Sequence, residues 1–331
     1  MQLVSERFTF AAMAEIGTDI QKAARLLREG KLVAVPTETV YGLAGNAFNE
    51  EAVLKIFEAK NRPHFDPLIV HSSGMEWVKE HVAVIPSIAR RLMDEFWPGP
   101  MTLVLPKKPI VPDLVTSGLD NVAVRVPSHS MTQELLRSID FPLAAPSANP
   151  FGYVSPTTAK HVNDQLGDKI EYILDGGPTI VGLESTIIGF EEGRPIIYRL
   201  GGLSVDVIED LIGPVEVALN QSSDPKAPGM LKSHYAPGKP LYYGNPGEMI
   251  HQFEGQRIGF LGFMTRLEFL PPDRQLLLSP DGDLHEAAVN LFAFMREFEK
   301  FPVDVILAER LPEIGLGRAI NDRLRRAAVN S

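Results

Sequence analysis

Residues 31–73 read KLVAVPTETVYGLAGNAFNEEAVLKIFEAKNRPHFDPLIVHSS, and this stretch decides the fold. Its first apolar run, Leu32–Val35, is too short for a helix and rich in β-branched residues, so it predicts a buried strand. A polar elbow, PTET, follows. Asn49 can then cap a helix that ends before Pro63. A second strand is expected over residues 67–71. Two buried strands therefore enclose more polar side chains than packing requires.

Composition limits the class of protein. The 331 residues exceed one average domain, and 44% hydrophobic with 22% charged residues is ordinary globular composition. A net charge of −10 argues against broad non-specific binding of nucleic acid. The chain has no cysteine, which excludes disulfides, thiol nucleophiles and Cys-ligated zinc and suits a cytoplasmic location. No apolar run approaches the ~20 residues that span a bilayer, and the start lacks a secretory pattern, so no membrane partner is expected.

The order of elements favours an α/β fold with a mixed sheet over simple βα repeats. Prolines punctuate residues 214–240, which predicts a stiff linker between a domain at 1–213 and a small parallel α/β domain at 241–331. Further strands are expected at 101–105, 122–126, 143–145, 172–174, 179–190, 195–200, 241–243, 258–263 and 303–308, with helices at 20–28, 75–81, 85–96, 131–139, 157–166, 284–298 and from about 316.

Three basic residues stand out. Arg125 lies inside the apolar strand 122–126, where an unpaired guanidinium is costly. It either makes a structural salt bridge or clamps an anion, and we favour the clamp because guanidinium binds carboxylate or phosphate in bidentate geometry. Lys60 and Arg62 could merely complement a helix C-terminus. The polar residues around them, which include Asp66, favour phosphate or carboxylate binding instead.

Hydroxyl groups follow two other strands. Ser147 and Asn149 could cap the next helix or hold a phosphate, and Ser155 could add a donor. Glu184–Thr186 could reflect strand preference alone. Its context does not match the nucleophile elbow, so a hydrolase triad is disfavoured.

Other motifs are absent. The sequence contains no phosphate-binding P-loop, and its glycines do not form a dinucleotide fingerprint. The histidines show no metal-ligand spacing, and His71 could be either a core histidine or a site residue. No carboxylate cage for a metal is visible, so we expect no metal ligands among the side chains.

The combination of motifs resembles the YrdC-like domain of the threonylcarbamoyl-AMP synthase family, in its long two-domain form. The fold expected from the resemblance is a twisted mixed-sheet domain followed by a small Rossmann-like domain. The motifs that carry it are PTETVYGL at 36–43, Lys60-x-Arg62, PLIVH at 67–71, VRVP at 124–127, PSAN at 146–149, EST at 184–186, HYAP at 234–237 and GLGRAI at 315–320.

The resemblance implies a reaction: L-threonine, bicarbonate and ATP form L-threonylcarbamoyl-AMP and pyrophosphate, for modification of an adenosine in tRNA. It implies a threonine pocket of Thr39, His71, Arg125, Ala145 and Ser185. It also implies an ATP site of Lys60, Arg62, Asp66, Asn121, Ser147, Asn149, Ser155, Arg199 and Tyr235, with Mg²⁺ held through the phosphates. Lys60 and Arg62 are the expected catalytic residues, and Tyr235 is expected to close over the site. Asp66 departs from the usual Asn, and its added charge could weaken ATP binding.

Alternatives stay open at this point. A non-catalytic protein that binds double-stranded RNA or tRNA is the main one, although the acidic balance speaks against it. A carbamoyl-transferring relative with zinc fingers is disfavoured by the missing cysteines. A nucleotide-binding regulator would bind ATP and ignore threonine. The tRNA and the downstream threonylcarbamoyl-transfer machinery are expected partners of the enzyme.

Overall fold

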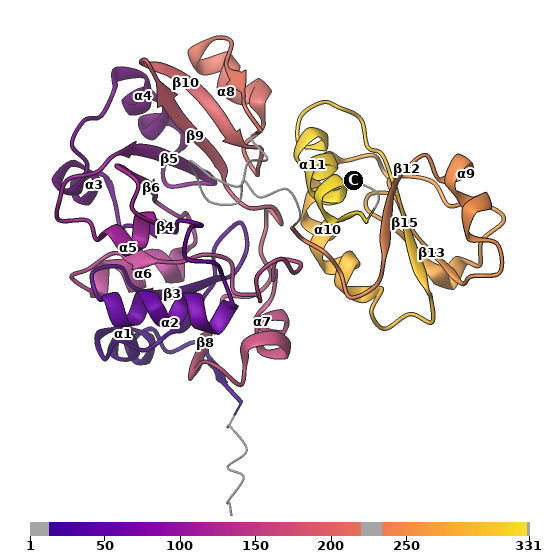
Figure 1. Cartoon of the computed structure of the whole chain (residues 1–331), viewed down its shortest axis with the longest axis horizontal. Coiled ribbons are helices and arrows are strands. Elements are labelled where there is room, and N and C mark those ends of the chain that lie inside the picture. Colours follow the sequence, from indigo (N-terminus) through magenta and orange to yellow (C-terminus); the bar gives the residue numbers. More distant parts are fainter. Residues whose placement is uncertain (1–12, 220–233, 330–331) are drawn as a thin grey trace, which may run out of the picture.

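The computed structural model describes residues 13–219 and 234–329 (Figure 1). In these residues, eleven strands form one mixed sheet in the order β1-β8-β2-β3-β7-β4-β6-β5-β9-β10-β11. Four further strands form a separate sheet, in the order β12-β15-β13-β14, in which all pairs are parallel. The predicted fold class, a mixed sheet followed by a small parallel α/β unit, is confirmed.

The large sheet and its helices take up the first two thirds of the chain. The strands are β1 Glu15–Gly17, β2 Val33–Val35, β3 Gly42–Asn46, β4 Ile69–His71, β5 Met101–Pro106, β6 Asn121–Arg125, β7 Leu143–Ala144, β8 Tyr172–Leu174, β9 Thr186–Glu191, β10 Arg194–Arg199 and β11 Glu216–Val217. The helices are α1 Ile20–Arg28, α2 Glu50–Lys60, α3 Met75–His81, α4 Ser87–Phe96, α5 Asp113–Thr116, α6 Ser130–Ser138, α7 Ala159–Leu166 and α8 Val205–Ile212.

The small sheet follows residues 220–233 in the chain. Its strands are β12 Leu241–Gly244, β13 Ile258–Gly262, β14 Gln275–Leu277 and β15 Val305–Glu309. The accompanying helices are α9 Pro246–Met249, α10 Leu284–Glu297 and α11 Gly317–Ala327, with short 3-10 turns η1 Ile250–Phe253 and η2 Pro272–Arg274. Helices α10 and α11 lie on the side of this sheet that faces the larger unit (Figure 1).

The stretch 31–73 folds largely as predicted, with one omission. The Asn49 side chain caps α2 by accepting a hydrogen bond from the Ala52 backbone N–H. The prediction omitted Gly42–Asn46, which follows the elbow and forms a strand, β3, antiparallel to β2. Its glycines explain why its pattern is weak: a Cβ on Gly45 would lie 3.1 Å from side-chain atoms of both Ile56 and Leu32, so the backbone of β3 lies close to α2 and to Leu32 there.

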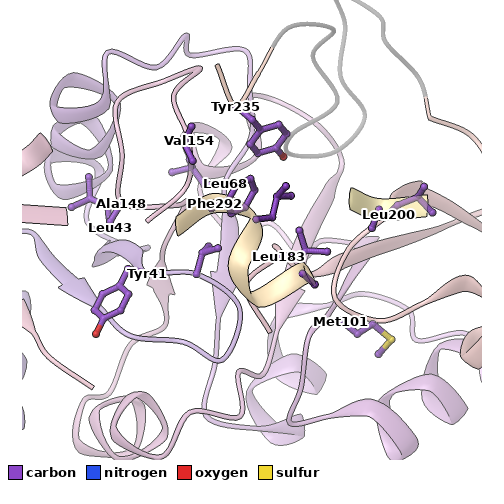
Figure 2. Packing of buried hydrophobic residues seen from close by; sticks show 14 of the residues in the cluster. Tyr41, Leu43, Leu68, Met101, Ala148, Val154, Leu183, Leu200, Tyr235 and Phe292 are labelled. Carbon is purple, nitrogen blue, oxygen red and sulfur yellow. The ribbon is translucent and has the colours of Figure 1, made fainter. Parts of the chain in front are cut away.

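The core continues across both units. Helices α1 and α6 cover one face of the large sheet with one apolar cluster. The main cluster on the other face includes Leu183 and Val154 from the larger unit and Phe292 from α10. Figure 2 shows Tyr235 and Phe292 beside these side chains, and the two rings stack with centroids 5.5 Å apart. Burial of shared apolar surface therefore joins the units, which favours one relative arrangement.

Two expectations differ from the structure in detail. The strand expected over 179–190 begins only at Thr186, so Glu184 and Ser185 stand in the loop before β9. Part of the expected linker, residues 220–233, lies outside the described residues. In its described part, Glu216 and Val217 form β11, beside β10. The described residues contain no helix long and apolar enough to cross a membrane.

Candidate active site

Most of the predicted site residues line one cavity. Its volume is about 590 Å³, which includes the solvent space at its opening. They reach it from the ends of β4, β6 and β10 and from the loops around them. The other walls include Thr37, Glu184 and His234. The predicted residues that line the cavity are Thr39, Arg62, His71, Arg125, Ala145, Ser147, Ser185, Arg199 and Tyr235.

Arg125 lies at the end of β6 and is 3% exposed. One Nη lies 2.8 Å from Glu38 Oε1, so the structural salt bridge exists. The other Nη donates to Thr39 Oγ1 (2.9 Å), and Nε donates to the Gly99 carbonyl (3.2 Å). A guanidinium has five N–H donors, so two remain for a ligand at the cavity. A carboxylate can take both.

His71 faces Arg125 across the parallel pair β4–β6. Burial and the neighbouring Arg125 charge hold the pKa of His71 well below its ordinary value, so the ring is neutral. Neither ring nitrogen has a hydrogen-bond partner in the described residues. A buried polar group of this kind needs a partner. A ligand in the cavity can supply it.

Arg62 and Asp66 form a second buried cation–anion pair. The Arg62 Nη2 lies 2.9 Å from Asp66 Oδ2 and also donates to the Pro67 carbonyl (2.9 Å). Nε donates to the Asp66 carbonyl (3.1 Å). Burial lowers the pKa of Arg62 and Asp66 raises it, yet the guanidinium stays charged at neutral pH. Its Nη1 is the donor left for a ligand.

Lys60 lies behind the cavity wall and does not line the cavity. Its ammonium, 1% exposed, donates to the carbonyls of Ser147 and Asn149, both at 2.5 Å. Burial, and next the Arg62 charge, hold the pKa of Lys60 well below its ordinary value. The predicted proximity of the Lys-x-Arg and Ser-x-Asn motifs exists. It fixes the loop that carries Ser147.

Asn149 and Ser155 likewise contact the wall from behind. The Asn149 amide donates to the carbonyls of Pro150 and Tyr153, both at 2.9 Å. The Ser155 hydroxyl donates to Glu184 Oε1 (2.6 Å). Both residues shape the loops at the cavity without lining it.

Ser185 and Arg199 close another side of the cavity. Arg199 donates to the Ser185 carbonyl from Nε (3.1 Å) and from Nη2 (2.9 Å), and Nη2 also reaches the Ser185 hydroxyl (3.1 Å). Burial lowers the pKa of Arg199 to about 10, so it remains a cation at neutral pH. The Ser185 hydroxyl also meets Thr102 Oγ1 at 2.7 Å.

Tyr235 reaches the cavity from the end of the linker. Its backbone has φ = +69°, a strained conformation for a bulky residue. The guanidinium groups of Arg323 and Arg326 each lie 5.0 Å from its ring centroid. Burial raises the pKa of the Tyr235 hydroxyl, which is therefore protonated at neutral pH. Helix α11 thus holds this tyrosine in place.

Asn121 is the predicted site residue that lies away from the cavity altogether. It begins β6, whereas Arg125 ends that strand. Four residues of strand separate their Cα atoms by about 13 Å. Asn121 lies beside a different surface hollow, with Val104 and Tyr198.

Three charged residues at the site were not assigned roles from the sequence. Glu38 pairs with Arg125, and the need of a buried arginine for a carboxylate could have indicated it. Glu184 belongs to the EST motif at 184–186, in which only Ser185 was assigned a role. Arg323 lies on the buried face of α11, beside Ile320 and Leu324, where a charge is unexpected unless it has a partner.

Comparisons with known proteins show to which family this chain belongs. A family model of the Sua5, YciO and YrdC proteins, described as telomere recombination, matches residues 25–201. A model described as the C-terminal domain of threonylcarbamoyl-AMP synthase matches residues 203–329. The Pyrococcus abyssi threonylcarbamoyl-AMP synthase is 44% identical over 93% of this chain and 94% of its own. The Bacillus subtilis synthase is 42% identical over 93% and 92%.

A solved structure agrees as well. The crystal structure of P. abyssi Sua5 complexed with L-threonine has a TM-score of 0.88 and 42% identity, and the match covers 96% of this chain and 97% of that one. The chain therefore belongs to the Sua5, YciO and YrdC family. Within it, the relatives that match the whole chain are the two-part threonylcarbamoyl-AMP synthases.

Proposed function

We propose that this chain is the enzyme that condenses L-threonine, bicarbonate and ATP to L-threonylcarbamoyl-AMP, pyrophosphate and water, and that it does so in the cavity described above. Family membership supports the reaction, since relatives with over 40% identity along the whole chain carry this name. The observation that carries the location is Arg125, a buried cation with two free donors beside a neutral, unpartnered His71.

The threonine pocket comprises Thr39, His71, Arg125, Ala145 and Ser185. Arg125 takes the substrate carboxylate with its two remaining N–H groups. The neutral His71 ring can hydrogen-bond a hydroxyl without adding positive charge. The P. abyssi relative with L-threonine bound supports a threonine site in this fold.

The nucleotide is met from the other side, by the Nη1 of Arg62, by Ser147 and by Arg199, with Tyr235 at the mouth. Lys60, Asn149 and Ser155 serve this side through the loops that they hold. The negative charge of Asp66 offsets part of the positive charge of Arg62, so it lowers the positive potential at the triphosphate. Asn121 is left out of the proposed site because it lies at the other end of β6.

Catalysis is by positioning and electrostatic stabilisation. The carbamate and the α-phosphate both carry negative charge, and they must meet in one cavity without repelling each other. Arg62, Arg125 and Arg199 supply fixed positive charge at low dielectric. No side chain that lines the cavity is placed as a covalent nucleophile activated by a base, so direct transfer is favoured.

Mg²⁺ is proposed to accompany the ATP. The described residues contain no group of three or more His, Asp or Glu side chains that could hold a metal ion. The phosphate oxygens of ATP would therefore be the ligands of the ion, which prefers oxygen ligands. When bound, it neutralises phosphate charge. The protein's own contribution is the cationic wall.

The proposal extends to biology and organisation. The product is expected to serve tRNA modification in the cytoplasm, with the threonylcarbamoyl-transfer machinery as the downstream partner. Residues 1–213 are proposed as the catalytic domain, 214–240 as a linker over the cavity and 241–331 as the accessory domain.

The reaction is tested by measuring pyrophosphate release while threonine, bicarbonate or ATP is omitted in turn. Each omission should abolish release. Arg125→Met should raise the threonine KM at least 100-fold, because it removes the carboxylate contact. Arg325→Met, on α11 and outside the cavity, is the matched control and should stay within twofold of wild type. Release that ignores threonine would contradict the proposed reaction, and an unchanged KM in Arg125→Met would contradict the pocket.

A further inference from the structure

A cation from the C-terminal unit lies directly behind the cavity. Arg323, on α11, is fully buried, and its Nε lies 2.9 Å from Glu184 Oε2. One Nη donates to the Leu200 carbonyl (2.7 Å) and the other to Asp322 Oδ2 (2.7 Å). Two of its three polar contacts thus cross to the larger unit. Of the cavity's own walls, it contacts Glu184 and the Tyr235 ring.

Glu184 is the one carboxylate among the residues that line the cavity. One of its oxygens accepts from Ser155 and the other from Arg323. Burial alone would raise the pKa of Glu184, but Arg323, and next Arg199, bring it below its ordinary value. Glu184 is therefore ionised at the cavity. Arg323 makes the direct ion pair with it, so Arg323 provides the larger part of the charge balance beside a triphosphate.

From this geometry we infer that Arg323 is a positioning residue for the reaction: it neutralises Glu184, so that the carboxylate orients Ser155 without repelling the ATP phosphates. The inference rests on the proposed function, because it assigns ATP to this cavity. It makes the larger unit dependent on a single charge from helix α11.

The charge-balance role makes a prediction that a packing role does not. In Arg323→Met, the methionine fills similar space but removes the cation that pairs directly with Glu184. ATP binding should weaken, with the ATP KM raised at least tenfold. In Glu184→Gln/Arg323→Met the anion is removed as well, and the amide can still accept from Ser155. The ATP KM should return to within about threefold of wild type.

The measurements are the ATP KM and kcat from pyrophosphate release, and the thermal midpoint, for the full-length wild type and three variants. Arg325→Met is the control on the same helix, since its guanidinium lies near Tyr243 and away from the cavity. Wild-type release that requires ATP and threonine validates the proposed function separately. If Arg323→Met unfolds but the double variant folds and works, the inference is supported.

Three results would overturn it. The first is an ATP KM in Arg323→Met within twofold of wild type. The second is a double variant no better than the single one. The third is an ATP KM raised as much in Arg325→Met as in Arg323→Met, because such an effect would not depend on Glu184.

Discussion

At the scale of single residues, the site is built from cations whose charge is already balanced. Arg62 pairs with Asp66, and Arg125 pairs with Glu38. Each guanidinium has five donors and uses only some of them on the protein, so one side of the group stays available. A lysine offers three donors on a point charge, and Lys60 uses two on backbone carbonyls. The remaining donors of Arg62 and Arg125 are available for a ligand, whereas Lys60 holds the loop that carries Ser147.

Lys60→Met tests this separation. The variant leaves the carbonyls of Ser147 and Asn149 without their donor, at about 1–3 kcal/mol for each unsatisfied buried group. We expect the free energy of unfolding to fall by several kcal/mol and the ATP KM to rise at least tenfold, because the Ser147 loop is released. Chemical denaturation and pyrophosphate release measure the two effects.

The control is Lys55→Met, which removes one contact of α2 with the Gly30 carbonyl (2.9 Å) away from the cavity. It should lose about 1 kcal/mol or less and keep the wild-type ATP KM. Threonine affinity, measured by calorimetry, should change less than threefold in both variants. A Lys60→Met enzyme with the wild-type ATP KM would refute the loop-holding role.

At the scale of elements, the loop that precedes β9 connects the wall of the cavity to the small unit. Residues 178–183 precede Glu184, and the Val181 N–H donates to the Glu38 carbonyl (2.8 Å). Gly182 adopts φ = +76°, and a Cβ there would lie 2.3 Å from the Ala288 carbonyl oxygen on α10. The loop therefore packs backbone against backbone, which only glycine permits.

Gly182→Ala should consequently do more harm than a left-handed backbone alone explains. Gly193, in the turn between β9 and β10, has φ = +79° and nothing within 4 Å of its Cβ position. Gly193→Ala should cost about 1–2 kcal/mol of stability, the usual penalty for a side chain in this conformation. Gly182→Ala should cost clearly more and should also lower kcat/KM. Equal losses in denaturation would show that contact with α10 is unimportant.

The element scale also explains what could be predicted. Helices α1, α2 and α10 were recognisable because apolar periodicity and capping residues coincide. Strand β3 was missed because Gly42 and Gly45, which lie close to Ala145 and to α2 respectively, remove the apolar signature. The Arg125 site was recognisable because a charge interrupts an apolar strand. Its partner Glu38 was not assigned, since pairing depends on tertiary contacts between distant segments.

At the scale of the whole molecule, the contact between the units includes a titratable group. His161, on α7, has its pKa lowered to about 4, first by burial and then by the charge of Arg296 from α10. Arg296 in turn donates to the Ser155 carbonyl (3.3 Å) and to Gln165 (2.9 Å). The role of α11 in the site was the least predictable feature, because it depends on how the two sheets dock.

The lowered pKa of His161 makes the stability of the folded chain depend on pH. The unfolded chain protonates His161 near pH 6.5, whereas the folded chain does so only near pH 4. Between these values the unfolded state binds more protons, so stability falls as pH decreases from 6.5 to 4. His161→Gln should flatten this part of the profile. Denaturation at pH 7.5, 6 and 5 measures it, with the exposed His251→Gln as control. An unchanged slope would contradict the assignment.

The buried pairs also have a consequence for selectivity. Because resident carboxylates pair with Arg62 and Arg125, the vacant pocket is less positive than three unpaired guanidinium groups would make it. Chloride, sulfate and other simple ions therefore gain less by entering than they would beside unpaired cations. Selectivity for the substrates then depends on the shape of the ligand and on the spacing of its acceptor atoms. When the products leave, Arg62 and Arg125 remain paired with carboxylates.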